Sequence, residues 1–407
     1  MGLSGDHQVK RTVLVVARSG APGRAPSRLV PPLTTQQAAA LHEALLLDTL
    51  AACRAEVPGT ALLFGDPEEA DGLRRLAGPD VPLLLQEGRG LADALRLGAA
   101  HHVEEGPVAL VFSDIPGIPP GSLERAFALL EEDADVVLGP ALGGGYWLVA
   151  MREYSDAPFR SIPWSTPAVH AVTLRRCEQA GLRVAELDQW RDVGTPVDLA
   201  FLLAEADDLP APRTAALMRG LRGVVGEPPA VRLDSSQFVT GSQWRAVIED
   251  RLLTEEGRYT GYTYLAVPRA VLVVPVTGEG EVALVLQYRH PVRDWTLEAP
   301  TGAVGDGETP LEAAERELAE RVGGEARAWR RLTAFYSASA HVGLRSDAFL
   351  ATGVVLGPSR AASDEDAAIV RVPVPEALRQ ARAGELRYGQ TALALLLAAP
   401  YLEGESR

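Results

Sequence analysis

The sequence predicts two domains of different class, an α/β domain with a mainly parallel sheet and, after it, an α+β domain. In residues 11–200, short apolar runs alternate with longer helical patterns, as in a parallel sheet covered by helices. A proline-rich stretch follows, and from Val231 on strand-like runs dominate. At 407 residues the chain also exceeds what one hydrophobic core usually holds.

In the first region, two long helical patterns, residues 34–56 and 91–105, lie between β-branched or leucine-rich runs bounded by Gly, Pro or Asp. The strand-like runs are TVLVVA, TALLF, VPLLLQ, PVALVF and ADVVLG. Sheets of this kind bind ligands at the carboxyl ends of their strands. A short helical pattern after Pro212, RTAALMRGLRGV, still belongs to this domain.

We predict a first domain over residues 1–226, a linker over 227–239 and a second domain over 240–407, because the proline-containing segment GEPPAVRLDSSQ separates the two patterns. The second domain has strand-like runs AVLVVPV, EVALVLQYRH, WTLEAP, LTAFYSA and DAFLATGVVL. A helix over 309–322 and another near 389–399 complete its α+β pattern.

Composition narrows the class of protein. The net charge of −15 argues against nonspecific nucleic-acid binding, which needs a basic surface, but still allows nucleotides. No apolar run is long enough to span a membrane, and the N-terminal residues show no signal-peptide pattern. Cys53 and Cys177 lie in helical patterns without metal-ligand spacing, which predicts reduced, partly buried thiols. We therefore expect a soluble cytoplasmic protein.

Residues 302–324, GAVGDGETPLEAAERELAERVGG, predict a glycine-rich loop followed by a well-capped helix. Thr309 can cap its N-terminus, Pro310 suits its first turn and Glu312 completes a capping box. Gly323-Gly324 ends the helix. The residues that share the packing face are Leu311, Ala314, Leu318 and Val322.

Glu317 and Glu320 share another face of this helix, with Arg321 adjacent. Two carboxylates beside a glycine-rich loop suit a hard cation bound to a diphosphate. A solvated Glu/Arg helix face is the alternative.

The segment resembles the Nudix box: Gly, five residues, Glu, seven residues, then Arg-Glu-apolar-x-Glu-Glu-x-Gly-apolar. The matching residues are Gly302, Glu308, Arg316, Glu317, Leu318, Glu320 and Gly323. Arg321 stands where the pattern has its last glutamate, and Gly324 where it has an apolar residue.

The preceding residues, QYRHPVRDWTLEAPTG, resemble the ADP-ribose pyrophosphatase branch of Nudix hydrolases, and the likeness covers roughly residues 240–400. It implies an α/β/α sandwich, Mg²⁺ or Mn²⁺, and cleavage of a nucleoside diphosphate derivative such as ADP-ribose or a nucleoside diphosphate sugar, often by a homodimer. It also implies that Glu317 and Glu320 are catalytic metal ligands, that the backbone near Gly302 is a further ligand, and that Arg289 and Glu298 contact substrate. A cross-strand ion pair is the alternative for Arg289 and Glu298.

Arg321 conflicts with this activity, because a guanidinium there removes a ligand and repels a cation. It could instead pair with Glu317 and stand in for the metal's charge. We therefore predict reduced or lost metal-dependent hydrolysis. A further acidic ligand could come from Asp347 or from the cluster Asp364-Glu365-Asp366, and the sequence does not choose between them.

Residues 11–220 carry a second likeness, in VVARSGAPGRAPSRLVPPL, PVALVFSDIPGIP, VVLGPALGGGYWLVAM and DVGTPVDL. They resemble Rossmann-like GT-A glycosyltransferase and nucleotidyltransferase proteins, relatives of the molybdenum-cofactor and phospholactate guanylyltransferases. The resemblance implies a metal ligand at Asp114 and a phosphate contact at Arg28. Pro26, Gly143 and Gly194 stand where that group has a lysine and two aspartates.

Three hypotheses therefore stay open. The first is a metal-dependent Nudix hydrolase that uses Glu317 and Glu320. The second is a catalytically impaired nucleotide-binding or regulatory protein. The third is an active nucleotidyl- or glycosyltransferase with Asp114 at its metal.

Overall fold

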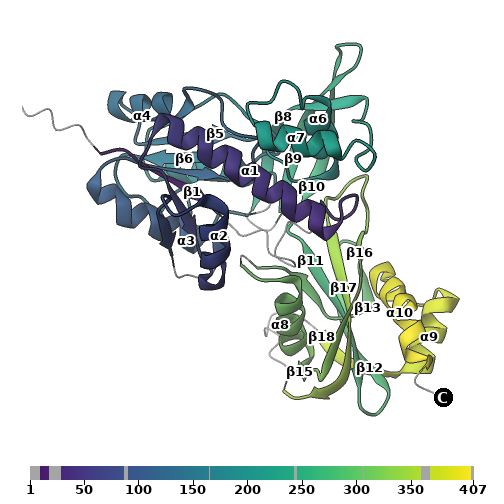
Figure 1. Cartoon of the computed structure of the whole chain (residues 1–407). Coiled ribbons are helices and arrows are strands. Elements are labelled where there is room, and N and C mark those ends of the chain that lie inside the picture. Colours follow the sequence, from purple (N-terminus) through teal and green to yellow (C-terminus); the bar gives the residue numbers. More distant parts are fainter. Residues whose placement is uncertain are drawn as a thin grey trace, which may run out of the picture. The chain divides into compact units, whose positions relative to one another are not determined.

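The computed structural model describes residues 10–17, 29–86, 90–164, 166–242, 245–305, 307–358 and 367–404 (Figure 1). The chain divides into two compact units, Met1–Thr263 and Tyr264–Arg407. Among the described helices, none is both long and apolar enough to cross a membrane.

The first unit contains a seven-stranded sheet of order β3-β2-β1-β4-β6-β5-β7. Every pairing is parallel except the two made by β6, so the predicted mainly parallel sheet is confirmed. The strands are β1 (Thr12–Val16), β2 (Ala61–Phe64), β3 (Leu83–Leu85), β4 (Val108–Phe112), β5 (Val136–Pro140), β6 (Tyr146–Met151) and β7 (Val184–Glu186). β6 lies outside the strand-like runs that the sequence indicated.

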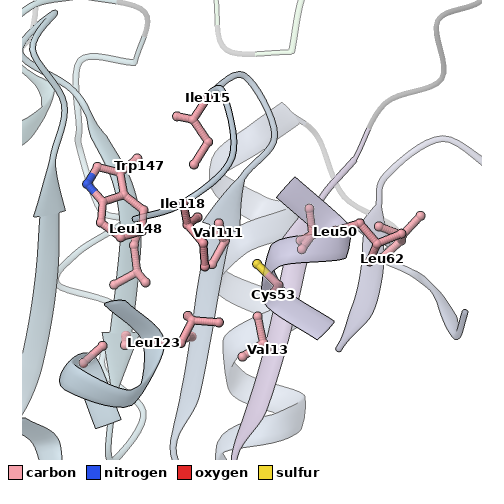
Figure 2. Close-up of a cluster of buried hydrophobic side chains, with 14 of the residues drawn as sticks. Val13, Leu50, Cys53, Leu62, Val111, Ile115, Ile118, Leu123, Trp147 and Leu148 are labelled. Carbon is pink, nitrogen blue, oxygen red and sulfur yellow. The ribbon is translucent and has the colours of Figure 1, made fainter. Parts of the chain in front are cut away.

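Helices bury both faces of this sheet, which explains why its strands are apolar throughout. α1 (Thr35–Glu56), α2 (Ala70–Ala77) and α4 (Ser122–Glu132) share one hydrophobic cluster with the sheet (Figure 2). α3 (Gly90–His102) and α5 (Val169–Gln179) share a cluster with alternate residues of the same strands. Short 3₁₀ turns cover Pro67–Glu69 and Val103–Glu105.

Both cysteines are buried and free, Cys53 on α1 and Cys177 on α5. Burial raises the pKa of both thiols, that of Cys177 to about 12. They are therefore inert thiols inside two different clusters of one unit.

α6 (Pro196–Ala204) and α7 (Pro212–Gly220) pack with residues of α1 in a separate cluster. The short helical pattern after Pro212 therefore packs against helices of the first unit. A three-stranded antiparallel sheet of order β10-β9-β8 follows, built from β8 (Val231–Ser242), β9 (Arg245–Thr254) and β10 (Tyr259–Ala266). Residues 231–239 of the predicted linker thus lie in β8, which pairs with β9 over its length.

The second unit is built on an eight-stranded mixed sheet, in which β14 and β17 flank β11 near its start. Its strands are β11 (Ala270–Thr277), β12 (Glu281–Arg289), β13 (Asp294–Glu298), β14 (Thr301–Ala303), β15 (Gly324–Glu325), β16 (Ala328–Tyr336), β17 (Arg345–Leu356) and β18 (Ala367–Pro373).

One helix, α8 (Pro310–Val322), covers one face of this sheet, and α9 (Val374–Ala383) and α10 (Gly389–Leu402) cover the other. The hydrophobic clusters on the two faces alternate along β11, with Val271 and Val273 toward α8 and Leu272 and Val274 toward α10. The predicted α/β/α sandwich is confirmed.

Local sequence fixes both ends of α8. Thr309 and Glu312 form the capping box, and Gly323 ends the helix with φ of 65°, a conformation that favours glycine. The predicted packing face is right for Ala314, Leu318 and Val322, which are buried, and wrong for Leu311, which is 39% exposed. Leu311 lies in the first turn, before the helix reaches the sheet core.

Candidate functional site

The Nudix-box segment places the carboxylate of Glu317 against the backbone of β14. Glu317 is 5% exposed, and a Cβ added at Gly302 would lie 1.9 Å from its Oε1. Only glycine at residue 302 therefore allows the carboxylate to occupy this place. Two of the predicted site residues, Gly302 and Glu317, are brought together in this way.

Arg316 connects the glycine-rich loop to the helix. Its Nε lies 2.7 Å from Oε1 of Glu308, and its Nη2 donates to the carbonyl oxygen of Ala303 at 2.8 Å. Its Nη1 donates to Oε1 of Glu317 at 2.6 Å and to Oε2 of Glu320 at 3.3 Å. One guanidinium thus orients three carboxylates, and its hydrogen bond is the main cause that lowers the pKa of Glu308.

Arg321 reaches Glu317 from the other side, with its Nε 3.4 Å from Oε2. Both oxygens of this carboxylate therefore face a guanidinium. Burial nevertheless raises the pKa of Glu317, against the lowering effect of Arg316 and Arg321. The alternative of a solvated helix face does not apply to Glu317, which is buried, whereas Glu320 is exposed.

The charges of these residues determine how strongly the site attracts a divalent cation. Three carboxylates, of Glu308, Glu317 and Glu320, face the guanidiniums of Arg316 and Arg321. With a glutamate at residue 321, four carboxylates would face the single guanidinium of Arg316. No group of three acidic, histidine or cysteine residues able to hold a metal occurs in the described parts of the chain. Mg²⁺, however, commonly takes one or two carboxylates and completes its shell with water and phosphate, so Glu317 and Glu320 fit a weakly held cation.

The other predicted substrate contacts form an ion pair between β12 and β13. Nε of Arg289 lies 2.7 Å from Oε1 of Glu298, which is 1% exposed and also accepts from the hydroxyl of Thr296. Burial and the nearby Glu298 raise the pKa of Tyr388. The structure therefore contains the cross-strand ion pair, the alternative that the sequence left open, and the side chain of Arg289 is partly exposed.

Asp347 is fully buried and hydrogen-bonded to two arginines, through Oδ2 to Nε of Arg269 and through Oδ1 to Nη2 of Arg331, at 2.5 and 2.8 Å. Burial would raise its pKa, but these hydrogen bonds lower it. A carboxylate held in this way is a poor further metal ligand. The other candidates, Asp364-Glu365-Asp366, lie outside the described residues.

In the first unit, Asp114 follows β4, at the carboxyl end of a central strand. Its carbonyl oxygen accepts from the backbone N–H of Val193, which places Asp192 beside it. Burial, then the charges of Asp114 and Asp198, raise the pKa of Asp192 to about 6. Asp192 has no predicted role of its own, because no local signal in the sequence brings together residues 78 positions apart.

Glycine replaces the expected acids around this pair. A Cβ at Gly143 would lie 3.1 Å from Oδ1 of Asp192, so an aspartate there would add a carboxylate to the same place. The N–H of Gly194 donates to Oδ2 of Asp198, which belongs to the capping box of α6. The predicted phosphate contact Arg28, and Pro26, lie outside the described residues.

Comparison with known proteins finds matches to two family models in the chain. Residues 266–389 match the model described as the NUDIX domain, and residues 49–166 match one described as an uncharacterized protein conserved in bacteria (DUF2064). An ADP-ribose pyrophosphatase of Bacillus subtilis (strain 168) is 32% identical over 130 residues, 31% of this chain and 70% of that protein.

The first unit has relatives of another kind. A 2-phospho-L-lactate guanylyltransferase of Haloarcula marismortui is 35% identical over 113 residues, 26% of this chain and 48% of that protein. The chain thus spans about half the length of that relative. A solved protein of Desulfovibrio desulfuricans G20, provisionally described as a nucleotide-diphospho-sugar transferase, is 25% identical, with a TM-score of 0.49 over 53% of this chain and 96% of that one.

Proposed function

Because this chain belongs to the Nudix family through its C-terminal unit, we propose that it hydrolyses the pyrophosphate linkage of a nucleoside diphosphate derivative, such as ADP-ribose or a nucleoside diphosphate sugar, with Mg²⁺ or Mn²⁺. One observation carries the proposal. The carboxylate of Glu317 is buried against Gly302, where the box requires both residues.

In the proposed reaction, water adds to one phosphorus and the bridging P–O bond breaks, which gives two phosphate monoesters. A divalent cation held by Glu317, Glu320 and the backbone at Gly302 would neutralise charge on the diphosphate. Arg316 fixes the position of Glu317 and Glu320 through its hydrogen bonds. Arg289 presents a guanidinium that Glu298 holds in one orientation for a phosphate oxygen.

Arg321 sets the efficiency that we expect. Its guanidinium faces Oε2 of Glu317 and competes with a cation for that oxygen. A positive charge a few ångströms from a bound cation repels it by about 4 kcal/mol, even at an effective dielectric constant near 20. We therefore propose a slow enzyme with weak metal affinity.

The test is turnover of nucleoside diphosphate derivatives by wild type, Glu317→Gln and Arg321→Glu, with Mg²⁺ or Mn²⁺ titrated. Glu315→Gln is the matched control, because Glu315 lies exposed on the same helix. Glu317→Gln should abolish turnover and Glu315→Gln should leave it unchanged. Arg321→Glu should strengthen metal binding about tenfold. Turnover that survives Glu317→Gln sinks the proposal.

Two alternatives keep specific support. Binding of nucleotides without turnover is favoured by the pairing of Arg321 with Glu317, and would appear as tight binding with no product. A transferase activity in the first unit is favoured by Asp114 and Asp192 at a strand end. Product formation that is lost in Asp114→Ala and unaffected by Glu317→Gln would support it.

A further inference from the structure

Three arginines surround one buried carboxylate in the second unit, and we name Arg269, Arg331, Arg345 and Asp347 the Asp347 cluster. Asp347 accepts from Arg269 through Oδ2 and from Nε and Nη2 of Arg331 through Oδ1. Its charge offsets only one of the three guanidiniums. The four side chains therefore carry a net charge of about +2, with Arg331 exposed and Arg269 and Arg345 partly buried.

Arg345 supplies the excess charge. Within the described residues, its guanidinium makes no hydrogen bond or ion pair, although it is partly buried. Burial and the charge of Arg269 both lower its pKa. A cation in this position gains from an anion more than it would on an open surface, because less water competes for it.

The cluster lies on the α8 face of the sheet. Side chains alternate along β17, and Phe349 and Ala351 pack in the hydrophobic cluster with α8. Arg345 and Asp347 have the same parity and therefore the same face. Arg331 pairs with Phe349 across the β16–β17 ladder and lies on this face too.

Strand register places the cluster near Glu317. Val271 on β11 pairs with Gly302 on one side and with Asp347 on the other. The Glu317 carboxylate packs against Gly302. Gly302 and Asp347 are therefore two strand spacings apart, about 10 Å. A substrate with its diphosphate at Glu317 could reach the cluster with a second charged group.

We propose that Arg269, Arg331 and Arg345 form a subsite for a second oxyanion of the substrate, a phosphate or carboxylate apart from the diphosphate that is cleaved. The location relative to the diphosphate rests on the proposed function. Asp347 fixes the guanidiniums of Arg269 and Arg331 through hydrogen bonds, and the planar guanidinium of Arg345 suits the oxygens of such a group.

The first experiment titrates inorganic phosphate into the full chain at low ionic strength. Arg345→Gln should weaken binding about tenfold, the effect of losing one charge-assisted hydrogen bond. It leaves both hydrogen-bonded partners of Asp347 in place, so the fold should persist. Arg330→Gln is the matched control, because Arg330 lies on the other face of β16, over the ring of Tyr401. It should bind phosphate like wild type.

The second experiment compares turnover of substrate pairs that differ in one anion. ADP-ribose 1″-phosphate against ADP-ribose tests a phosphate, and UDP-glucuronate against UDP-glucose tests a carboxylate. Wild type should prefer the anionic member of at least one pair, by a lower KM. Arg345→Gln should remove that preference and leave turnover of the member without the additional anion unchanged.

The outcomes separate this inference from the proposed function. If no nucleoside diphosphate derivative is hydrolysed, the proposed function fails, and the phosphate titration alone decides the subsite. If hydrolysis occurs but Arg345→Gln binds phosphate as tightly as wild type, the subsite is wrong. If phosphate binding falls but neither anionic substrate is preferred, a second anion of the substrate is not its ligand and the proposal is overturned.

Discussion

The two candidate sites of this chain have each lost an expected acid, with opposite electrostatic results. In the second unit the replacement is a cation, so Glu317 faces the guanidiniums of Arg316 and Arg321. In the first unit the replacements are glycines, and Asp192 faces the carboxylates of Asp114 and Asp198 with backbone N–H groups as its hydrogen-bond donors. The first carboxylate is hydrogen-bonded to two guanidiniums, and the second has other carboxylates beside it.

This difference shows that losing a ligand does not by itself predict what happens to the remaining site. Burial raises the pKa of both carboxyl groups. Around Glu317 the arginines oppose the rise and keep the charged form bound within a network. Around Asp192 the neighbouring acids add to the rise. Ionisation of either carboxyl group therefore costs stability at neutral pH, but the arginines reduce this cost at Glu317 and the neighbouring acids add to it at Asp192.

The largest effect is expected from Arg316→Met. The change removes the hydrogen bonds that hold Glu317, Glu308 and Glu320, and leaves a buried carboxylate with one weak partner. We expect a loss of about 3 kcal/mol in the free energy of unfolding of the second unit. Urea unfolding measures it. Arg321→Met, which removes the longer contact of 3.4 Å with Glu317, should cost less than Arg316→Met, about 1 kcal/mol. Equal losses from the two changes would contradict the central role of Arg316.

Asp192→Asn should stabilise the first unit by about 2 kcal/mol at pH 8 and by nothing near pH 3. The folded pKa of about 6 lies above the ordinary value of 3.8, so the folded state binds more protons than the unfolded state between them. Wild-type stability is therefore full below pH 3.8 and falls as pH rises through 6. Thermal unfolding across pH 3–8 measures the difference, with the exposed Asp188→Asn as control. A pH-independent effect would show that the folded pKa of Asp192 is not raised.

Replacing a glycine beside each carboxylate tests how closely that carboxylate packs against the backbone. An added Cβ would lie 1.9 Å from Oε1 of Glu317 at Gly302, but 3.1 Å from Oδ1 of Asp192 at Gly143. Gly302→Ala should displace Glu317 and reduce kcat/KM at least about tenfold, or about 1.4 kcal/mol. Gly143→Ala should leave turnover unchanged. Gly278→Ala, in open space within the second unit, is the control for glycine replacement itself. Unchanged turnover in Gly302→Ala would show that the carboxylate need not lie there.

The smallest effects are expected from removing the capping threonine of α8 or of α6. Thr309→Ala on α8 and Thr195→Ala on α6 each remove a side chain that accepts a backbone hydrogen bond. Each should cost about 1 kcal/mol of its own unit's stability. Calorimetry should show two transitions, each shifted by one variant alone. A shift of both transitions by one variant would mean that the units unfold together.

Local signals made α8 the most predictable element. The residues Thr309, Pro310 and Gly323 lie beside the helix ends that they determine, so the sequence locates the ends within one residue. β8 was predicted largely as linker because VRLDSSQFVTGS is polar and mostly exposed, without the apolar alternation of a half-buried strand. The segment forms a strand because it pairs with β9, which its own residues do not indicate.

Long-range placement was beyond the sequence. Asp347 appeared as a candidate metal ligand, because nothing near it reveals that Arg269 and Arg331 arrive from two other segments. The same holds for Asp192 beside Asp114. The Nudix-box pattern, by contrast, did predict that Gly302 and Glu317 belong to one site, and the structure brings them together from β14 and α8.

The two buried cysteines have a practical consequence. Both belong to the first unit, and residues 264–407 contain none. A thiol reagent can therefore modify this chain only when the first unit opens, at a rate set by the free energy of that opening. Modification of Cys53 and Cys177, one inside each face of the same sheet, would time the opening of the two layers separately in the intact chain, while the second unit remains silent.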